Sequence, residues 1–155
     1  MSERSPVAPG AGPAIIATLT RRTSFAAAHR YRRPEWDDAR NAEVFGLCAR
    51  PHYHGHTYVC DVSISGPIDP MTGMVIDLGL LDRVLAREVG EAFDHRNLNL
   101  DVPEFADGGR VPTTENVAQL IFQRMQSALG PAVRVTCVRV AEDDRLWAEV
   151  RVDAR

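Results

Sequence analysis

Two histidines separated by one residue, His54-Gly55-His56, are the sharpest chemical signal in the 155-residue sequence. In a β-strand, side chains two residues apart point to the same side and lie about 7 Å apart, so two imidazoles can converge on one ion. His29, at the end of an earlier apolar stretch, is the natural third ligand. Three protein ligands and one open position are typical of a catalytic zinc site. The competing interpretation is two half-buried polar side chains, but buried imidazoles on an apolar face need partners.

Three further residues could act on protons. Cys48 could be a nucleophile, a base or a small buried side chain, and for an isolated cysteine the buried interpretation is favoured. Asp94 stands directly before His95. A carboxylate beside a histidine can set the tautomer and basicity of the ring, as in a catalytic triad. The ordinary alternative is a histidine that ends a helix and interacts with the helix dipole.

Other polar positions have simpler local explanations. Thr113, Thr114 and Glu115 have the pattern of a helix N-terminus, with a threonine cap and an acid in the first turn. Glu142 precedes a tight turn and is most simply a turn residue. His52 falls outside the alternating strand pattern and is interpreted as a loop residue rather than a ligand.

The first half of the chain must supply two strands that carry these histidines. Residues 14–28 are apolar and β-rich, which predicts a strand with an irregularity near Arg21-Arg22. Residues 31–53 are polar and predict a long loop with room for one helical turn. From His54 to Ser65 the residues alternate, which predicts a strand with one buried face.

The second half predicts two helices and two strands. Apolar residues recur at spacings of three and four over 77–93 and 114–129. Residues 133–140 and 146–152 predict strands joined by a tight turn. The order of elements indicates the α+β class, with a four-stranded antiparallel sheet and two helices on one face. Such a sheet has open edges, which pairing between subunits would cover.

Composition narrows the class of protein. All 18 basic residues are arginine, which excludes a Schiff-base lysine and a Walker-type phosphate loop. A net charge of −3 argues against a nucleic-acid partner, and no apolar run is long enough for a membrane span. Three cysteines without CxxC spacing indicate a reducing, cytoplasmic compartment. Residues 1–13 are expected to form a flexible tail, and residues 14–155 a single domain.

Several segments together resemble the 6-pyruvoyl-tetrahydropterin synthase and 6-carboxytetrahydropterin synthase family. The resemblance covers the chain from about Leu19 to Val150. Its segments, in order, are FAAAHR (25–30), FGLCARPHYHGHTY (45–58), DPMTGMVIDL (69–78), FDHRNLN (93–99), DVPEFAD and PTTENVA (101–118) and VAEDD (140–144). The resemblance implies the tunnelling fold with a ββααββ subunit, a homohexamer built as a dimer of trimers, and active sites at subunit interfaces.

The resemblance also implies roles for residues. His29, His54 and His56 would hold Zn²⁺. Cys48 would be the general base, with Asp94 and His95 as its relay. Glu142 would anchor the pterin ring, and Thr113, Thr114 and Glu115 would line the same pocket. The substrate would be 7,8-dihydroneopterin triphosphate.

The expected activity is a zinc-dependent carbon–oxygen lyase that makes 6-pyruvoyl-tetrahydropterin with loss of triphosphate. The spacing of five residues between Cys48 and His54 resembles that of the pyruvoyl branch. The arginine-only, alanine-rich composition favours the alternative, a 6-carboxytetrahydropterin synthase of the queuosine and deazapurine pathway that acts on the same substrate. An alternative of another class is a non-catalytic pterin- or zinc-binding protein. In the absence of lysine, the triphosphate would be bound by arginines beside the motifs, for which the candidates are Arg30, Arg32, Arg50 and Arg96.

Overall fold

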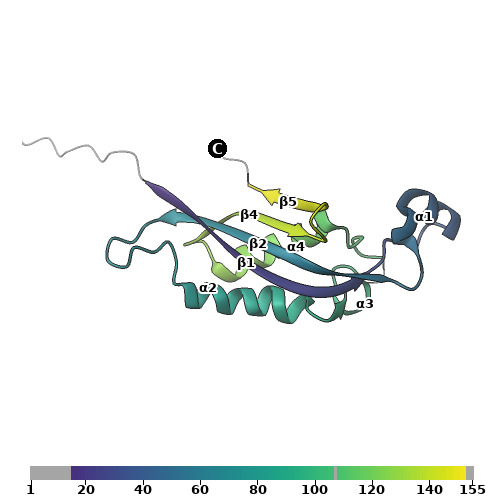
Figure 1. Cartoon of the computed structure of the whole chain (residues 1–155), viewed down its shortest axis with the longest axis horizontal. Coiled ribbons are helices and arrows are strands. Elements are labelled where there is room, and N and C mark those ends of the chain that lie inside the picture. Colours follow the sequence, from purple (N-terminus) through teal and green to yellow (C-terminus); the bar gives the residue numbers. More distant parts are fainter. Residues whose placement is uncertain (1–14, 107, 153–155) are drawn as a thin grey trace, which may run out of the picture.

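The computed structural model describes residues 15–106 and 108–152, and it has the predicted α+β architecture (Figure 1). The predicted tail, residues 1–13, lies outside the described residues, and the single-domain assignment of residues 14–155 stays a prediction. Two long antiparallel strands dominate the fold: β1 (Ile16–His29) and β2 (His54–Pro67). Strands β4 (Arg134–Ala141) and β5 (Trp147–Arg151) continue the antiparallel sheet beyond β2.

The sheet has one strand more than the sequence predicts. A two-residue strand, β3 (Arg96–Asn97), pairs in parallel with the end of β1, so the order is β3-β1-β2-β4-β5. The expected four antiparallel strands are all present. Two residues carry no periodic signal, which is why β3 could not be found from the sequence.

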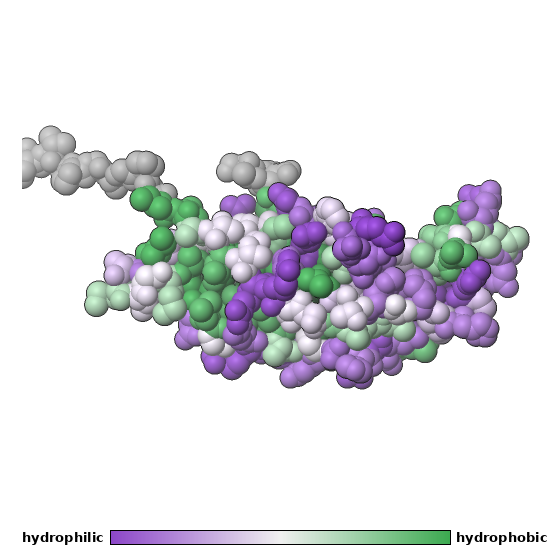
Figure 2. All heavy atoms as spheres, in the orientation of Figure 1, coloured by the Kyte–Doolittle hydropathy of each residue, from purple (hydrophilic) through white to green (hydrophobic). Residues whose placement is uncertain are grey.

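The predicted irregularity at Arg21-Arg22 is wrong. Strand β1 pairs with β2 without a break from Ile16↔Pro67 to His29↔His54. The two arginines interrupt the apolar pattern because both faces of the sheet carry a partner for them: Arg21 donates to Asp82, and Arg22 donates to Asp61. Figure 2 shows hydrophilic side chains crossing this face of the molecule, with hydrophobic ones gathered around the start of β1.

Two main helices cover one face of the sheet, and the predicted ranges of both are confirmed. Helix α2 (Leu78–Leu85), capped by Asp77, continues as a π-helical segment η2 (Ala86–Glu91). Helix α4 (Thr114–Leu129) begins after Thr113, whose side chain accepts from the Asn116 amide, and ends at Gly130 with φ of +71°. A short helix, α3 (Leu98–Asp101), follows β3.

The core lies between this helical layer and the buried face of the sheet. On β2 the alternation is as predicted, with Tyr58, Cys60, Val62 and Ile64 all buried. Phe25 of β1 stacks on Tyr58, with ring centroids 4.8 Å apart, and lies 5.5 Å from the ring of Phe93. The rigid sheet therefore ends, at His29 and His54, directly beside packed aromatic rings. Within residues 15–106 and 108–152, no helix combines the length and apolar character needed to cross a membrane.

The long predicted loop between β1 and β2 contains more helix than one turn. It forms α1 (Asp38–Phe45) and a 3₁₀ turn, η1 (Gly46–Ala49), at one end of the molecule (Figure 1). Asn41 is buried and holds the loop together. Its side-chain oxygen accepts from the Arg33 amide at 2.8 Å, and its nitrogen donates to the carbonyls of Arg33, Trp36 and Asp37.

Replacing Asn41 with alanine should therefore destabilise the loop. Buried backbone groups left without a partner cost about 1–3 kcal/mol, so the free energy of unfolding should fall by that amount. Urea denaturation measures the change. Glu43→Ala, on the exposed side of the same helix, is the control and should leave stability nearly unchanged. Equal stability of the two variants would contradict this account of the loop.

Candidate metal and substrate site

Three histidines meet where β1 ends and β2 begins. His29 and His54 are paired across the two strands, and His56 follows two residues along β2. One ligand atom from each of the three lies within 4.8 Å of the other two. Strand pairing is tight here, because a Cβ on Gly55 would lie 3.3 Å from the Ala27 carbonyl oxygen. The pairing of the two strands thus brings all three imidazoles together.

The chemistry of this trio fits a metal. The Nδ1 atom of His29 lies 2.8 Å from the Pro112 carbonyl oxygen, which leaves Nε2 as the ligand atom. His56 has a buried Nε2 atom without a hydrogen-bond partner in the described part of the chain. His29 is fully buried, and burial lowers its pKa to about 4. A neutral imidazole at neutral pH is the form that coordinates a cation.

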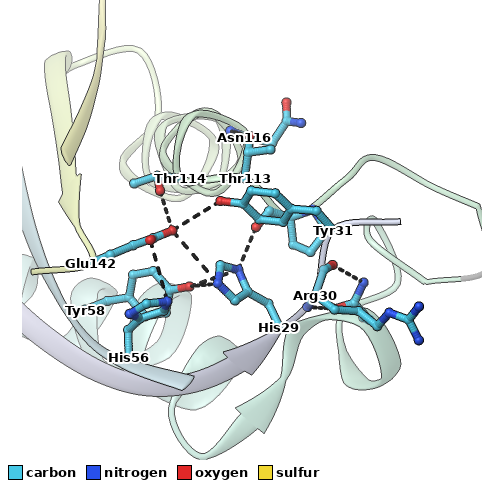
Figure 3. A network of polar contacts seen from close by, with 11 residues as sticks. His29, Arg30, Tyr31, His56, Tyr58, Thr113, Thr114, Asn116 and Glu142 are labelled. Atoms are coloured by element: carbon cyan, nitrogen blue, oxygen red, sulfur yellow. Dashed lines mark hydrogen bonds and ion pairs between the residues drawn. The ribbon is translucent and has the colours of Figure 1, made fainter. Parts of the chain in front are cut away.

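A carboxylate faces the histidines (Figure 3). Glu142 is buried, and its Oε1 atom accepts hydrogen bonds from Thr114 Oγ1 at 2.5 Å and from the Tyr31 hydroxyl at 3.3 Å. Its Oε2 atom lies 3.5 Å from His56 Nε2, and Oε1 lies 3.9 Å from His29 Nε2. The interpretation of Glu142 as a simple turn residue is therefore wrong: it follows β4, but its side chain turns inward to the site.

Two tyrosines and one carbonyl in the site were not singled out from the sequence. Tyr58 contacts His29, with its hydroxyl oxygen 3.1 Å from Nδ1. Tyr31 packs edge-on against His29 and reaches Glu142. Each tyrosine lies two residues after a candidate ligand. Because residues two apart in an extended chain point to the same side, this spacing could have indicated that the tyrosines lie in the site. The Pro112 carbonyl has no sequence signal, because it depends on how α4 docks.

Cys48 lies in η1, beside the same site. Its carbonyl oxygen accepts from the Tyr31 amide at 2.8 Å, which ties η1 to the end of β1. The thiol is half-buried. Burial, and then the negative charge of Glu142, raise the pKa of the Cys48 thiol above its ordinary value. In the chain alone, Cys48 is thus mostly protonated at neutral pH.

Asp94 and His95 form a pair at the other side of β1. Asp94 Oδ2 lies 2.9 Å from His95 Nδ1, and its Oδ1 accepts from the Ala26 amide at 2.8 Å. That amide, and then His95, hold the pKa of Asp94 below its ordinary value. His95 has φ of +56° and a side chain 82% exposed. Among the described residues, no hydrogen bond or ion pair joins this pair to Cys48 or to the three histidines.

The remaining predicted residues lie at the start of α4 and in the loop. Thr114 is buried and contacts Glu142, as described above. Thr113 caps the helix, with its hydroxyl 3.3 Å from the Asn116 amide, and Glu115 is exposed in the first turn. His52 is exposed in the turn before β2 and is absent from the histidine cluster.

Fold and site together define an α+β protein with the donor set of a mononuclear metal enzyme. A family model described as 6-pyruvoyl tetrahydropterin synthase matches residues 18–153. The chain belongs to this family, and as a member it is an enzyme, a carbon–oxygen lyase.

Individual relatives agree with this assignment. The chain is 42% identical over 135 residues to the human protein named 6-pyruvoyl tetrahydrobiopterin synthase, covering 87% of this chain and 91% of the human one. The solved structure of Caenorhabditis elegans 6-pyruvoyl tetrahydropterin synthase superposes with a TM-score of 0.84 at 35% identity, covering 90% of this chain and 97% of that one. A putative 6-carboxy-5,6,7,8-tetrahydropterin synthase of Archaeoglobus fulgidus is 37% identical over 98 residues, covering 63% and 75% of the two chains.

Proposed function

We propose that the chain converts 7,8-dihydroneopterin triphosphate to 6-pyruvoyl-tetrahydropterin with loss of triphosphate. The observation that carries the proposal is the histidine trio beside the buried carboxylate of Glu142. The names of the animal relatives support the pyruvoyl product. The reaction is internally balanced: a proton leaves carbon, the carbon–oxygen bond to triphosphate breaks with its electron pair, and the side chain is oxidised as the pterin ring is reduced.

His29, His54 and His56 would hold the cofactor, which we propose to be Zn²⁺ because nitrogen ligands suit it. When bound, the ion supplies Lewis-acid polarisation of the substrate hydroxyls, which acidifies the neighbouring carbon-bound protons. Tyr58 and the Pro112 carbonyl orient His29. The buried position of His29 also keeps water away from one side of the site.

Cys48 would act as the base that removes the carbon-bound proton. Its raised pKa means that it needs positive charge nearby to act near neutral pH. We propose that this charge comes partly from His95 of a neighbouring subunit, oriented by Asp94. Because no hydrogen bond or ion pair joins Asp94 and His95 to Cys48 among the described residues, we place the sites at subunit interfaces, in a homohexamer built as a dimer of trimers. Three free cysteines support a reducing, cytoplasmic location.

Glu142 would accept hydrogen bonds from the amino-pyrimidine edge of the pterin, with Thr113, Thr114 and Glu115 beside it. Thr114→Val keeps the shape of the side chain but removes the 2.5 Å hydrogen bond to Glu142. Hydrogen bonds to charged groups contribute about 1.5–3 kcal/mol, so KM for the pterin should rise about 10- to 100-fold, with a smaller change in kcat. Steady-state kinetics measures both.

Thr20→Val is the matched control for this variant, because the Thr20 hydroxyl bonds the Ser63 hydroxyl on an exposed part of the sheet. Its kinetic constants should equal those of the wild type. An unchanged KM in Thr114→Val would remove Thr114 from the set of residues that orient Glu142.

Product analysis tests the proposed reaction directly. The purified, zinc-loaded chain is incubated with 7,8-dihydroneopterin triphosphate, and the product is identified by mass spectrometry with and without a reductant. The pyruvoyl mass with stoichiometric triphosphate supports the proposal. A 6-carboxy product would move the chain to the second candidate, which the match to the Archaeoglobus fulgidus protein favours. Pterin retained for hours without triphosphate release would indicate a non-catalytic binder.

A further inference from the structure

Four arginines line two adjoining cavities at the α1 end of the molecule. A cavity of about 200 Å³ has Arg30, Arg32 and Arg110 in its wall. A second, of about 250 Å³, has Arg30, Arg32 and Arg50 in its wall. We call this pair of cavities the arginine groove. Arg96, which the sequence also suggested, lies apart from it, in a cavity beside His95.

The positive charge of the groove is largely unneutralised. Of the described residues in its walls, Asp38 carries the carboxylate, and it pairs with Arg32, with Nη1 and Oδ1 2.6 Å apart. Arg110 donates instead to the neutral Gln119 side chain at 3.3 Å. Within residues 15–106 and 108–152, no ion pair involves Arg30, Arg50 or Arg110. Among the described lining residues, four guanidinium groups face one carboxylate, an excess of three positive charges.

Asn99 holds the backbone of Arg30, and the Arg30 side chain carries a buried donor that is unpaired in the described part of the chain. Its backbone amide donates to Asn99 Oδ1 at 2.8 Å, and its carbonyl accepts from Asn99 Nδ2 at 3.0 Å. Its guanidinium lies 5.9 Å from the centre of the Tyr53 ring. Its Nε atom is buried without a hydrogen-bond partner among the described residues. A fixed, desolvated donor in a cationic cavity favours a multiply charged anion.

The groove adjoins the segments that hold the histidine cluster. Arg30 follows His29 along the chain, and Tyr53 precedes His54. Figure 3 shows the Arg30 side chain pointing away from His29, so the groove opens on the other side of this strand end. A flexible anion with several phosphates can bridge guanidinium groups spread over both cavities, whereas a single carboxylate can reach only one or two.

We propose that the arginine groove binds a polyphosphate group. This group can come from two sources: the triphosphate of the substrate or leaving group, or a separate triphosphate-bearing molecule. The first source rests on the proposed function, and the second does not.

Inorganic tripolyphosphate is the probe. Isothermal titration of the zinc-loaded wild type should give saturable binding that weakens as salt rises. Arg30→Gln and Arg110→Gln should each raise the dissociation constant tenfold or more. Arg134→Gln, which removes the same charge from β4 outside the groove, should bind like the wild type. Because Arg110 lies in a loop, its variant tests the groove even if Arg30→Gln fails to fold.

Kinetics separates the two sources. If tripolyphosphate inhibits competitively and Arg110→Gln raises KM for the pterin triphosphate, the groove binds the triphosphate group of the substrate. Inhibition or activation with an unchanged KM assigns it to a separate ligand. No binding to the wild type at millimolar tripolyphosphate, or equal binding by the groove variants and Arg134→Gln, overturns the proposal. Wild-type turnover without tripolyphosphate binding would contradict the groove proposal but not the proposed reaction. Tripolyphosphate binding without turnover would contradict the proposed reaction but not the groove proposal.

Discussion

Glutamine in place of His56 should remove both the metal and the activity. His56 supplies one of three imidazoles whose ligand atoms lie within 4.8 Å of one another, and its buried Nε2 atom has no hydrogen-bond partner among the described residues. Changes to groups that merely support metal ligands cost about 10- to 100-fold in affinity, so loss of a ligand should exceed that. Lewis-acid polarisation contributes several kcal/mol, so turnover should fall by about 10³-fold or more.

Metal content by mass spectrometry, measured after dialysis against a weak chelator, tests the first expectation, and initial rates test the second. His52→Gln is the matched control: it removes an imidazole four residues away that is exposed and lies outside the cluster. This control should keep one zinc per chain and full activity. If His56→Gln also kept both, the trio would not be the metal site, whatever its geometry suggests.

The sequence predicts best where one residue period extends over a whole element. The alternation of β2 correctly places His54 and His56 on the face that continues into Tyr58 and Cys60, because a buried face imposes a strict period of two. The range of α4 is also correct, since Thr113 and Gly130 are strong end signals for a helix. The β2 pattern thus predicts the position of two of the three histidines, and the third, His29, ends the neighbouring strand β1.

The remaining parts of the site depend on contacts between distant segments. Glu142 resembles a turn residue locally, and only the docking of α4 against β4 brings Thr114 to its carboxylate. The pairing of His95 with β1 depends on a backbone bond from the His95 amide to the Ala26 carbonyl, 2.6 Å long, which no local pattern encodes. The resemblance to a family supplied the roles of these residues, but that no hydrogen bond or ion pair joins Asp94 and His95 to Cys48 among the described residues could be seen only in the coordinates.

Removing the Cys48 thiol should slow proton abstraction while leaving the fold and the metal intact. Cys48 is half-buried, and its link to Tyr31 runs through its backbone carbonyl, so Cys48→Ala keeps that contact. General bases contribute about 10²–10⁴-fold to rate, and kcat should fall by that factor with little change in KM. Zinc content should remain that of the wild type, which separates this variant from His56→Gln.

The pH dependence of the rate provides the stricter test of Cys48. Burial and Glu142 raise the pKa of the thiol, so the protonated, inactive form predominates at neutral pH unless nearby positive charge lowers that pKa. If the thiolate is the base, kcat/KM of the wild type should rise with pH up to the thiol pKa. The alkylation rate of Cys48 should rise with pH in the same way, and bound zinc should shift this rise in alkylation rate to lower pH. Cys60→Ala, which removes a buried thiol from the hydrophobic core, should keep the wild-type profile. A Cys48→Ala enzyme that retained the same rising limb would assign the base to another group, and His95 would be the next residue to test.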